Sequence, residues 1–587
     1  MPYSNTDQAI IKRNIVKGRR EMARLLGRVR RQFVLVATFA AFINLLVLAG
    51  PLFMLQVYDR VLPARSLPTL SNLFLLVAFL FTMMGVIDWA RGRLLARIGA
   101  DHQRGLERRV FDAAIIDATI NTQERSSNNA LRDLEIVQRY YASPVAAAVF
   151  DLPWTPLYLG VLFVFHPWLG ALAFAGGATL ILLSLATQFV TRGRMEETTQ
   201  LENKARYLGN DFLRQIETVV SLGMRESGFK RWQAARHESM DNAIRATDLS
   251  GSFHASMRAL RMLLQTSMLA LGAYLVLQGE LSAGAMIAAS ILMGRSLAPV
   301  ELAVGGWTQW QRASVARDRL AALLGAHPPE QKGTEWVSPK ARLAVEDITV
   351  RPANSDRAAI EMISFSLEPG EALGVIGPLG AGKSVLARSL CNFSHPSSGT
   401  IRLDEVPLDQ YDRDNLGRLI GYLPQSVTFF PGTVAENIAR LDLAPDMDRV
   451  IAAAKRAGAH QMILKMPAGY DTPIEFEGAS LSDRQRQLVA LSRALYHDPI
   501  LLILDEPNLL LSGDAGACRH TMLSDLKARG GAAIVMTNSP GALAECERIL
   551  VLDHGAQRAL GARDDVLKRM IASATKARVV PRADSAA

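Results

Sequence analysis

Long stretches without charged residues dominate the first half of the chain. Residues 33–57 contain no Asp, Glu, Lys or Arg, and residues 66–87 repeat this pattern. As a helix, each stretch is long enough to cross a hydrocarbon core of about 30 Å. Between them, the sequence YDRVLPAR at 58–65 is polar and contains a proline, which predicts a short turn. The pattern therefore predicts two membrane spans joined by a tight connection.

A longer uncharged run covers residues 152–191. It has room for two spans, because one span needs about 20 residues. The sequence FHPWLG interrupts this run, and its His166 and Pro167 are typical of a turn. We expect a hairpin of two membrane helices there.

A final apolar pair, at 262–278 and 281–294, is short for a membrane span. Arginines flank the two segments at positions 258, 261 and 295. A buried hairpin in a soluble domain is the alternative interpretation. Helices that border an aqueous cavity tolerate shorter and more polar sequences, which favours membrane for this pair. Six spans result.

The basic residues indicate how the spans are oriented. Residues 1–32 form a basic segment directly before the first span, with the cations Lys12, Arg13, Lys17, Arg19, Arg20, Arg24, Arg28, Arg30 and Arg31. Such a cluster is typical of a cytoplasmic flank, and six spans bring both chain ends to that side. We therefore interpret the basic residues behind the formal charge of +9 as a flank at the lipid bilayer, and we expect no nucleic acid partner. The connections 91–144 and 192–257 would also be cytoplasmic, and apolar residues at helical intervals predict that the helices continue there.

The pattern changes after the Pro- and Gly-containing sequence GAHPPEQKG at 325–333. Short β-type runs such as LAVEDITV and LGVIG then alternate with helical ones, which is typical of an α/β domain. The predicted domains follow from these changes. They are a basic N-terminal segment at 1–32, a transmembrane domain at 33–324, a linker at 325–342, an α/β nucleotide-binding domain at 343–565 and a C-terminal tail at 566–587.

A glycine-rich loop follows the run ALGVIG and fits the pattern GxxxxGK[ST]. In this pattern, successive backbone N–H groups surround phosphate oxygens, and the start of the next helix adds favourable partial charge. Lys383 would reach the β- and γ-phosphates of ATP, and the Ser384 hydroxyl would bind Mg²⁺. The predicted nucleotide-binding residues are Gly377, Pro378, Leu379, Gly380, Ala381, Gly382, Lys383, Ser384 and Val385.

An apolar run, ILLILDEP, ends in two carboxylates. Asp505, at the end of a buried strand, would stabilise the magnesium shell, as such an aspartate does in P-loop enzymes. Glu506 is placed to polarise an attacking water. Gln425, in the sequence GYLPQSVTFFPGTVAENI, follows the glycine-rich loop, and LSDRQRQ precedes the Asp-Glu strand.

In the order of these segments the chain resembles the ABC transporter family, in which two nucleotide-binding domains enclose two ATP molecules. The membrane half resembles the permease–ATPase subunits of type I protein secretion systems, in the branch that exports proteases and S-layer proteins. The sequence segments that carry this resemblance are NLLVLAGPLFMLQVYDRVLPARSLPTL, DLPWTPLYLGVLFVFHPWLG and GAMIAASILMGRSLAPVE. The resemblance implies a six-helix transmembrane domain of ABC exporter type, followed by an α/β P-loop domain. It also implies that Gln425 helps to bind Mg²⁺ and takes part in catalysis with Glu506.

One segment departs from the family pattern. Members usually have LSGGQ, whose Ser hydroxyl and Gly N–H groups face the γ-phosphate bound by the opposite subunit; here the segment after Leu481 consists of Ser482, Asp483, Arg484 and Gln485. Glycine allows the backbone to approach phosphate closely. At about 4 Å and an effective dielectric constant near 20, each like-charge pair costs on the order of 4 kcal/mol. We expect Asp483 to weaken the closed sandwich; harmless solvated substitutions are the alternative.

Three further positions differ from the family pattern. Asn538 lies where a histidine would contact the γ-phosphate, and an amide cannot take up a proton at neutral pH. Asp514 comes two residues late in the loop after the Asp-Glu strand. Pro352 is near the position where many relatives stack an aromatic ring on adenine. We therefore expect ATP binding to be retained and hydrolysis by the isolated chain to be reduced.

The sequence predicts an ATP-driven exporter subunit that moves an unfolded polypeptide out of the cytoplasm. The alternative is a half-transporter that binds ATP, hydrolyses it poorly and works as a heterodimer with a competent paralogue. The resemblance implies further partners: a second ABC subunit, a periplasmic adaptor (membrane fusion protein), an outer-membrane channel and the secreted polypeptide. It also implies a multi-pass protein of the bacterial inner membrane.

Overall fold

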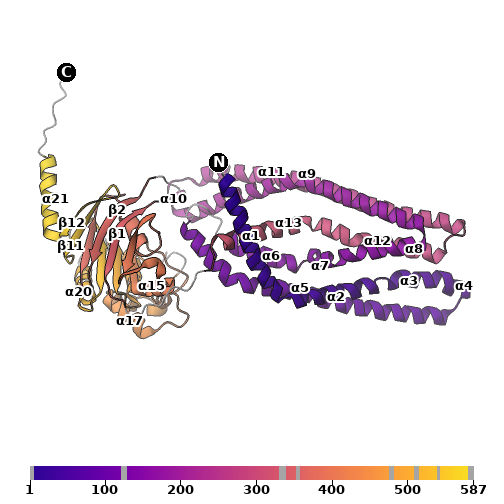
Figure 1. The fold of residues 1–587 in the computed structure, drawn as a ribbon, viewed down its shortest axis with the longest axis horizontal. Coiled ribbons are helices and arrows are strands. Elements are labelled where there is room, and N and C mark those ends of the chain that lie inside the picture. Colours follow the sequence, from indigo (N-terminus) through magenta and orange to yellow (C-terminus); the bar gives the residue numbers. More distant parts are fainter. Residues whose placement is uncertain are drawn as a thin grey trace, which may run out of the picture. The chain divides into compact units, whose positions relative to one another are not determined.

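The chain folds into two compact units, one helical and one α/β (Figure 1). This computed structural model describes residues 5–120, 129–329, 339–351, 357–474, 481–507, 514–538 and 543–578. The first unit comprises residues 1–117 and 125–328, and the second comprises 118–124 and 329–587.

The helical unit consists of long helices joined by short turns. Its elements are α1 (Asn5–Arg28), α2 (Arg30–Leu46), α3 (Ala49–Gln56), a π-helical turn (Val57–Val61), α4 (Leu62–Ala64), α5 (Leu67–Ile120), α6 (Ala130–Tyr141), α7 (Pro144–Asp151), a 3-10 turn (Leu152–Trp154), α8 (Thr155–Phe165), α9 (Pro167–Arg214), α10 (Ile216–Ser221), α11 (Arg225–Leu277), α12 (Ala283–Gly305) and α13 (Trp307–Ala326). The 54 residues of α5 extend over about 80 Å, far more than a bilayer core requires. The helix therefore continues well beyond the length that one span needs; the cytoplasmic location of this extension stays a prediction.

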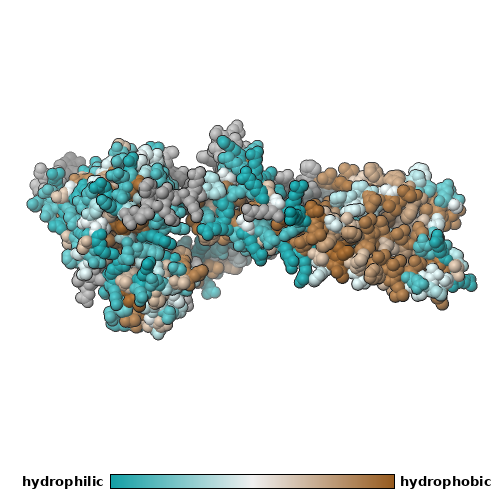
Figure 2. Space-filling model, turned by 60° about the horizontal axis from the view of Figure 1, so that its bottom comes forward, coloured by the Kyte–Doolittle hydropathy of each residue, from teal (hydrophilic) through white to brown (hydrophobic). Residues whose placement is uncertain are grey.

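Six helical segments among the described residues are apolar and long enough to cross a membrane, as the sequence predicts. They are Arg30–Ala64, Leu67–Thr119, Pro144–Phe165, Pro167–Thr187, Arg225–Leu277 and Ala283–Ala303. On the helical unit, Figure 2 shows a broad band of hydrophobic residues with hydrophilic residues on both sides of it. This distribution suits a unit that crosses a bilayer.

The third span begins at Pro144, before the charge-free run that starts at residue 152. Its helix can include Asp151 because neighbouring side chains compensate the charge of this residue. One carboxylate oxygen of Asp151 accepts hydrogen bonds from Asn44 Nδ2 and Arg91 Nη1, each over 2.8 Å. Arg91 also pairs with Asp88 over 2.7 Å. A charged side chain with such partners is tolerated near the membrane, so the helix extends back to Pro144.

The connection predicted at 58–65 is mostly helical, so the expectation of a polar turn there was wrong except at its end. The π-helical turn and α4 carry the helix to Ala64, and the reversal occurs at Arg65, whose φ is 49°. The polar residue Asp59 has a structural role instead: its carboxylate accepts hydrogen bonds from Ser282 Oγ over 2.6 Å and from Gly284 N over 2.9 Å. Asp59 therefore compensates free N–H groups at the start of α12.

The other two hairpins agree with the sequence. α8 ends at Phe165 and α9 begins at Pro167, and between them the His166 ring accepts a hydrogen bond from Trp168 N over 3.3 Å. The last span, on α12, is the most enclosed of the six, with 61% of its most hydrophobic window buried inside the helical unit. Protein contacts thus replace part of the lipid contact, which explains why a short and less apolar sequence is sufficient.

The second unit is built on a mixed sheet. Its strands are β1 (Leu343–Val350), β2 (Ile360–Leu367), β3 (Ala372–Ile376), β4 (Ser398–Leu403), β5 (Val406–Pro407), β6 (Ile420–Leu423), β7 (Gly432–Thr433), β8 (Pro473–Ile474), β9 (Leu501–Asp505), β10 (Ala532–Met536), β11 (Arg548–Asp553) and β12 (Ala556–Ala562). Its helices are α14 (Lys383–Leu390), α15 (Arg413–Leu419), α16 (Val434–Ile438), α17 (Met447–Arg456), α18 (His460–Leu464), α19 (Asp483–Leu495), α20 (Asp514–Ala528) and α21 (Arg563–Arg578). Ten strands follow the order β5-β4-β1-β2-β12-β11-β3-β10-β9-β6, and β7 pairs with β8.

The parallel part of the sheet determines where the site lies. β11, β3, β10, β9 and β6 run parallel to one another. β9 is buried on both faces: Leu502 and Leu504 belong to one hydrophobic core, and Leu501 and Ile503 to the other. Because parallel strands end at the same edge, the residues after β3, β6, β9 and β10 meet there.

The predicted domain boundaries remain predictions. Helix α13 ends at Ala326 and β1 begins at Leu343, on either side of the predicted linker. Of that linker, residues 330–338 lie outside the described part of the chain. Helix α21 crosses the predicted start of the C-terminal tail at 566, so the first residues of that tail are helical.

Candidate functional site: a phosphate-binding loop with two carboxylates

The glycine-rich loop lies between the end of β3 and the start of α14. Gly380 and Gly382 have φ angles of 80° and 98°, in the left-handed region that glycine adopts at least cost. At Gly377 a Cβ atom would lie 2.3 Å from the backbone oxygen of Leu552, so no larger residue fits. These glycines let the loop turn tightly at the N-terminus of α14, a position suited to phosphate.

Lys383 is held inside this loop. Its ammonium group donates hydrogen bonds to the backbone oxygens of Gly377 over 2.7 Å and Pro378 over 3.3 Å. It also donates to Asn538 Oδ1 over 3.0 Å. The side chain is only 5% exposed, so the charge lies in the loop rather than in solvent.

Asp505, the last residue of β9, is buried beside Ser384. Burial raises the pKa of the Asp505 carboxyl, and the Glu506 carboxylate adds to this rise, while a hydrogen bond with the Ser384 side chain opposes it. Among the described residues, Asp505 Oδ1 has no hydrogen-bond partner although it is buried. A buried carboxylate oxygen without a partner, next to a serine hydroxyl, fits a divalent cation such as Mg²⁺.

Glu506 links the two sides of the site. Its Oε2 accepts a hydrogen bond from Gln425 Nε2 over 2.8 Å, and its Oε1 lies 3.5 Å from Lys383 Nζ. Its backbone has a φ of 51°, and its N–H donates to the backbone oxygen of Met536 over 2.9 Å. A non-glycine residue in this conformation is strained, and such strain is concentrated at functional sites.

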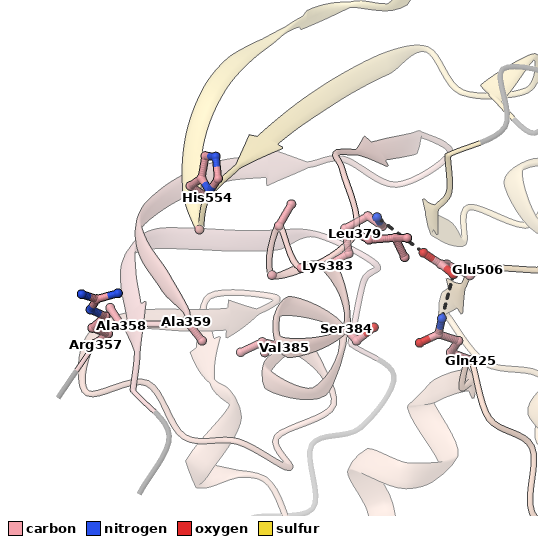
Figure 3. A pocket seen from close by; sticks show the side chains of 14 residues that line it. Arg357, Ala358, Ala359, Leu379, Lys383, Ser384, Val385, Gln425, Glu506 and His554 are labelled. Atoms are coloured by element: carbon pink, nitrogen blue, oxygen red, sulfur yellow. Dashed lines mark hydrogen bonds and ion pairs between the residues drawn. The ribbon is translucent and has the colours of Figure 1, made fainter. Parts of the chain in front are cut away.

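Loop residues 379–385, Gln425 and Glu506 line a pocket of about 500 Å³ (Figure 3), whereas Asp505 and Asn538 are not among its lining residues. The pocket lining contains most of the predicted nucleotide and catalytic residues, together with others that the sequence analysis did not select: Arg357, Ala358, Ala359, His554 and Gly555. For His554 and Gly555 the sequence signal is DHG between two β-type runs, which is typical of a hairpin turn but does not indicate a ligand. The structure thus brings the strand-end residues together around a volume large enough for a small-molecule ligand.

The degenerate signature segment begins helix α19. Ser482 is its N-cap, and its hydroxyl accepts from Gln485 N over 3.4 Å while Gln485 Oε1 accepts from Ser482 N over 2.9 Å. This capping box satisfies two backbone donors. The Asp483 carboxylate is 73% exposed and forms an ion pair with Arg486, and Arg484 is exposed. Sequence analysis missed Arg486, although the i, i+3 spacing on a helix indicates the pair.

The predicted roles of the signature residues involve a second subunit, so they remain predictions. Pro352 lies outside the described residues, as do residues 508–513 before Asp514. Asp514 itself is the first residue of α20. Asn538, by contrast, follows β10 and reaches Lys383, as described above.

Comparison with known proteins identifies the family. Residues 360–509 match the family model described as ABC transporter, and residues 33–299 match the ABC transporter transmembrane region. The type I secretion system ATP-binding protein PrsD of Rhizobium meliloti (strain 1021) is 38% identical over 557 residues, covering 94% of this chain and 96% of that protein. The exotoxin translocation ATP-binding protein PaxB of Pasteurella aerogenes is 27% identical over 538 residues, covering 90% and 74%.

The fold is also found among solved structures. The structure of a bacterial Atm1-family ABC exporter with ATP bound superimposes with a TM-score of 0.82 at 22% identity, covering 95% of this chain and 99% of the other. The predicted fold class is therefore confirmed: a helical transmembrane domain of ABC exporter type, followed by an α/β P-loop domain. The chain belongs to the ABC transporter family.

Proposed function

We propose that this chain is the permease–ATPase subunit of a type I protein secretion system, which uses ATP to move an unfolded polypeptide out of the cytoplasm. The observation that carries the proposal is the likeness to PrsD along nearly the whole chain, at 38% identity over 557 residues. PaxB, an exotoxin translocation protein by name, supports the same class of cargo. ATP hydrolysis in the second unit supplies the energy for transport.

Each site residue has its own role in ATP binding or hydrolysis. Lys383 and the loop 377–385 bind the phosphates of ATP, and Glu506 polarises the attacking water. Gln425 orients Glu506 through their 2.8 Å hydrogen bond. Ser384, Gln425 and Asp505 would hold Mg²⁺, which neutralises charge on the phosphate oxygens.

The active unit is a dimer, because the segment 482–485 serves the ATP bound to the opposite subunit. A periplasmic adaptor, an outer-membrane channel and the secreted polypeptide are the further partners that a type I system requires. The protein lies in the bacterial inner membrane with both chain ends in the cytoplasm. The basic residues of α1, among them Lys12, Arg13 and Arg20, are exposed before the first span and support this orientation.

The hydrolysis-impaired alternative receives no support from the comparisons. The observations behind it, Asp483, Arg484 and Asn538, come from the sequence. We therefore propose a hydrolysing exporter. That the isolated chain hydrolyses ATP at a reduced rate remains a prediction.

Export in cells tests the proposed function. A strain lacking the gene is complemented with the wild type, with Lys383→Ala or with Lys465→Ala, and the proteins of the growth medium are compared by mass spectrometry. We expect one or more polypeptides to disappear from the medium and to accumulate in cells with Lys383→Ala. Lys465 is an exposed lysine of the same unit and serves as the matched control. An unchanged medium in the Lys383→Ala strain contradicts the proposal.

A further inference from the structure

The turn between β11 and β12 lies against the phosphate-binding loop. The backbone oxygen of Gly555 accepts a hydrogen bond from Glu361 N over 2.8 Å, which fixes the turn to the start of β2. A Cβ atom on Gly382 would lie 2.9 Å from the backbone oxygen of Ala359 and 3.8 Å from Gly555 Cα. The turn, the start of β2 and the phosphate loop are therefore in direct contact. The side chain of His554 is thus placed at the rim of the ATP pocket.

His554 occupies a left-handed backbone position, which histidine adopts more often than most other non-glycine residues. His554 and Gly555 form a two-residue hairpin turn, with φ angles of 48° and 81°. Such a turn favours Asn, Asp or Gly at its first position. The imidazole is 89% exposed, and its Nε2 lies 3.7 Å from Asp553 Oδ1. Because the imidazole lines the pocket and is largely exposed, it is free to contact a ligand there.

The pocket has two chemically different ends. Figure 3 shows Glu506 and Gln425 on one side of it, and Arg357 and His554 on the opposite side, with the loop around Lys383 between them. Once the β- and γ-phosphates lie at the loop, the nucleoside of ATP has to extend toward the end that lacks the carboxylate. Among the described lining residues, His554 carries the only aromatic ring.

We propose that His554 stacks on the nucleobase of ATP, with Arg357 bordering the same subsite. This inference rests on the proposed function, because it assigns a role within the same ATP site. Planar aromatic side chains stabilise a base by stacking, and an arginine beside the base adds a second planar cationic group. The nucleobase subsite is therefore built from the hairpin turn as well as from the segment before β2. His554 acts on affinity for the nucleoside and takes no part in phosphate chemistry.

Comparing two ligands separates the contribution of the base to binding from that of the phosphates. We would measure binding of ATP and of inorganic tripolyphosphate, each with Mg²⁺, to the full chain in detergent by isothermal titration calorimetry. His554→Asn is the test variant, because asparagine favours the left-handed turn and preserves the fold. His395→Asn is the matched control, since His395 is an exposed histidine of the same unit outside the pocket. We expect His554→Asn to weaken ATP binding about tenfold, or 1.4 kcal/mol, and to leave tripolyphosphate binding unchanged.

The outcomes distinguish this inference from the proposed function. Equal ATP affinity in the wild type and in His554→Asn overturns the inference and leaves the ATP site intact. A parallel loss of both ligands in His554→Asn also overturns it, because the residue would then act through the phosphate loop. A wild-type chain that binds neither ligand contradicts the proposed function itself.

Discussion

The ammonium group of Lys383 donates a hydrogen bond to the side-chain oxygen of Asn538 over 3.0 Å. The bond joins the phosphate loop after β3 to the segment after the neighbouring strand β10. An amide at this position can accept from the lysine and can donate through its NH₂ group, but it cannot carry the charge of an imidazolium. We therefore expect Asn538 to contact the same phosphates as Lys383 and to stabilise their charge less well than a histidine would.

Removing the lysine should abolish nucleotide binding. In the proposed site, Lys383 supplies the cation and backbone N–H groups supply the other phosphate ligands, so Lys383→Ala should leave the phosphate charge uncompensated. We expect labelling by a photoreactive ATP analogue to fall to background in Lys383→Ala and to persist in Lys465→Ala. Undiminished labelling would mean that the loop does not hold the phosphates.

Restoring the family residues should accelerate hydrolysis. In a homodimer, both ATP sites would face Asp483 and Arg484, and both would contain Asn538. We expect the triple variant Asp483→Gly, Arg484→Gly and Asn538→His to raise kcat at least about tenfold, corresponding to some 1.4 kcal/mol off the barrier. The measurement is steady-state phosphate release by the purified chain. If the wild type already turns over as fast as the triple variant, the substitutions are harmless and Arg486 compensates for Asp483.

The contact between Asp59 and α12 predicts a size limit at Gly284. A Cβ atom there would lie 2.6 Å from Asp59 Oδ1 and 2.7 Å from the backbone oxygen of Leu55. Forcing an extra carbon into such a contact typically costs about 1–3 kcal/mol. We expect Gly284→Ala to lower the unfolding temperature in detergent. Gly85→Ala is the control, because a Cβ atom at Gly85 meets nothing within 4 Å; equal unfolding temperatures of the two variants would refute the contact.

Asp133 should make the helical unit less stable at neutral pH than at mildly acidic pH. Burial raises the pKa of this carboxyl from 3.8 to about 6, and Arg319 and Arg132 only partly oppose the rise. An acid with a raised folded-state pKa binds its proton more tightly when folded. Its charged form therefore destabilises the fold above about pH 6, and this penalty fades as the pH falls toward 4.

The variant Asp133→Asn should show this penalty directly. A rise from 3.8 to about 6 corresponds to about 3 kcal/mol at high pH. We expect Asp133→Asn to raise the unfolding temperature in detergent at pH 8, with a smaller gain at pH 5. A gain independent of pH, or a loss at pH 8, would show that the ion pair with Arg319 outweighs the cost of burial.

The sequence predicted features that depend on local patterns. Six spans follow from the uncharged runs, and the strand–loop–helix context of Gly377–Ser384 follows from β-type and helical periodicity. The helical course of 58–65 could not be predicted, because Asp59 is stabilised by the distant Ser282 and Gly284. The start of the third span at Pro144 was missed for the same reason, since Asp151 is compensated by Asn44 and Arg91.

The candidate site shows the same division. Lys383, Asp505 and Glu506 belong to contiguous motifs, so their types and spacing are informative by themselves. His554 comes from a hairpin more than 150 residues away from the phosphate loop, and only the sheet order β12-β11-β3 brings it to the pocket. Pairing between such distant strands leaves no signal in a local pattern.

The central claim is that this chain hydrolyses ATP through Glu506, and its most direct test is the ATPase rate of the purified chain in lipid nanodiscs. General-base catalysis typically contributes about 10²–10⁴-fold, so Glu506→Gln should lower the rate at least about a hundredfold while calorimetric ATP binding persists. Equal rates in the wild type and in Glu506→Gln, or a wild type without turnover above background, would contradict the account.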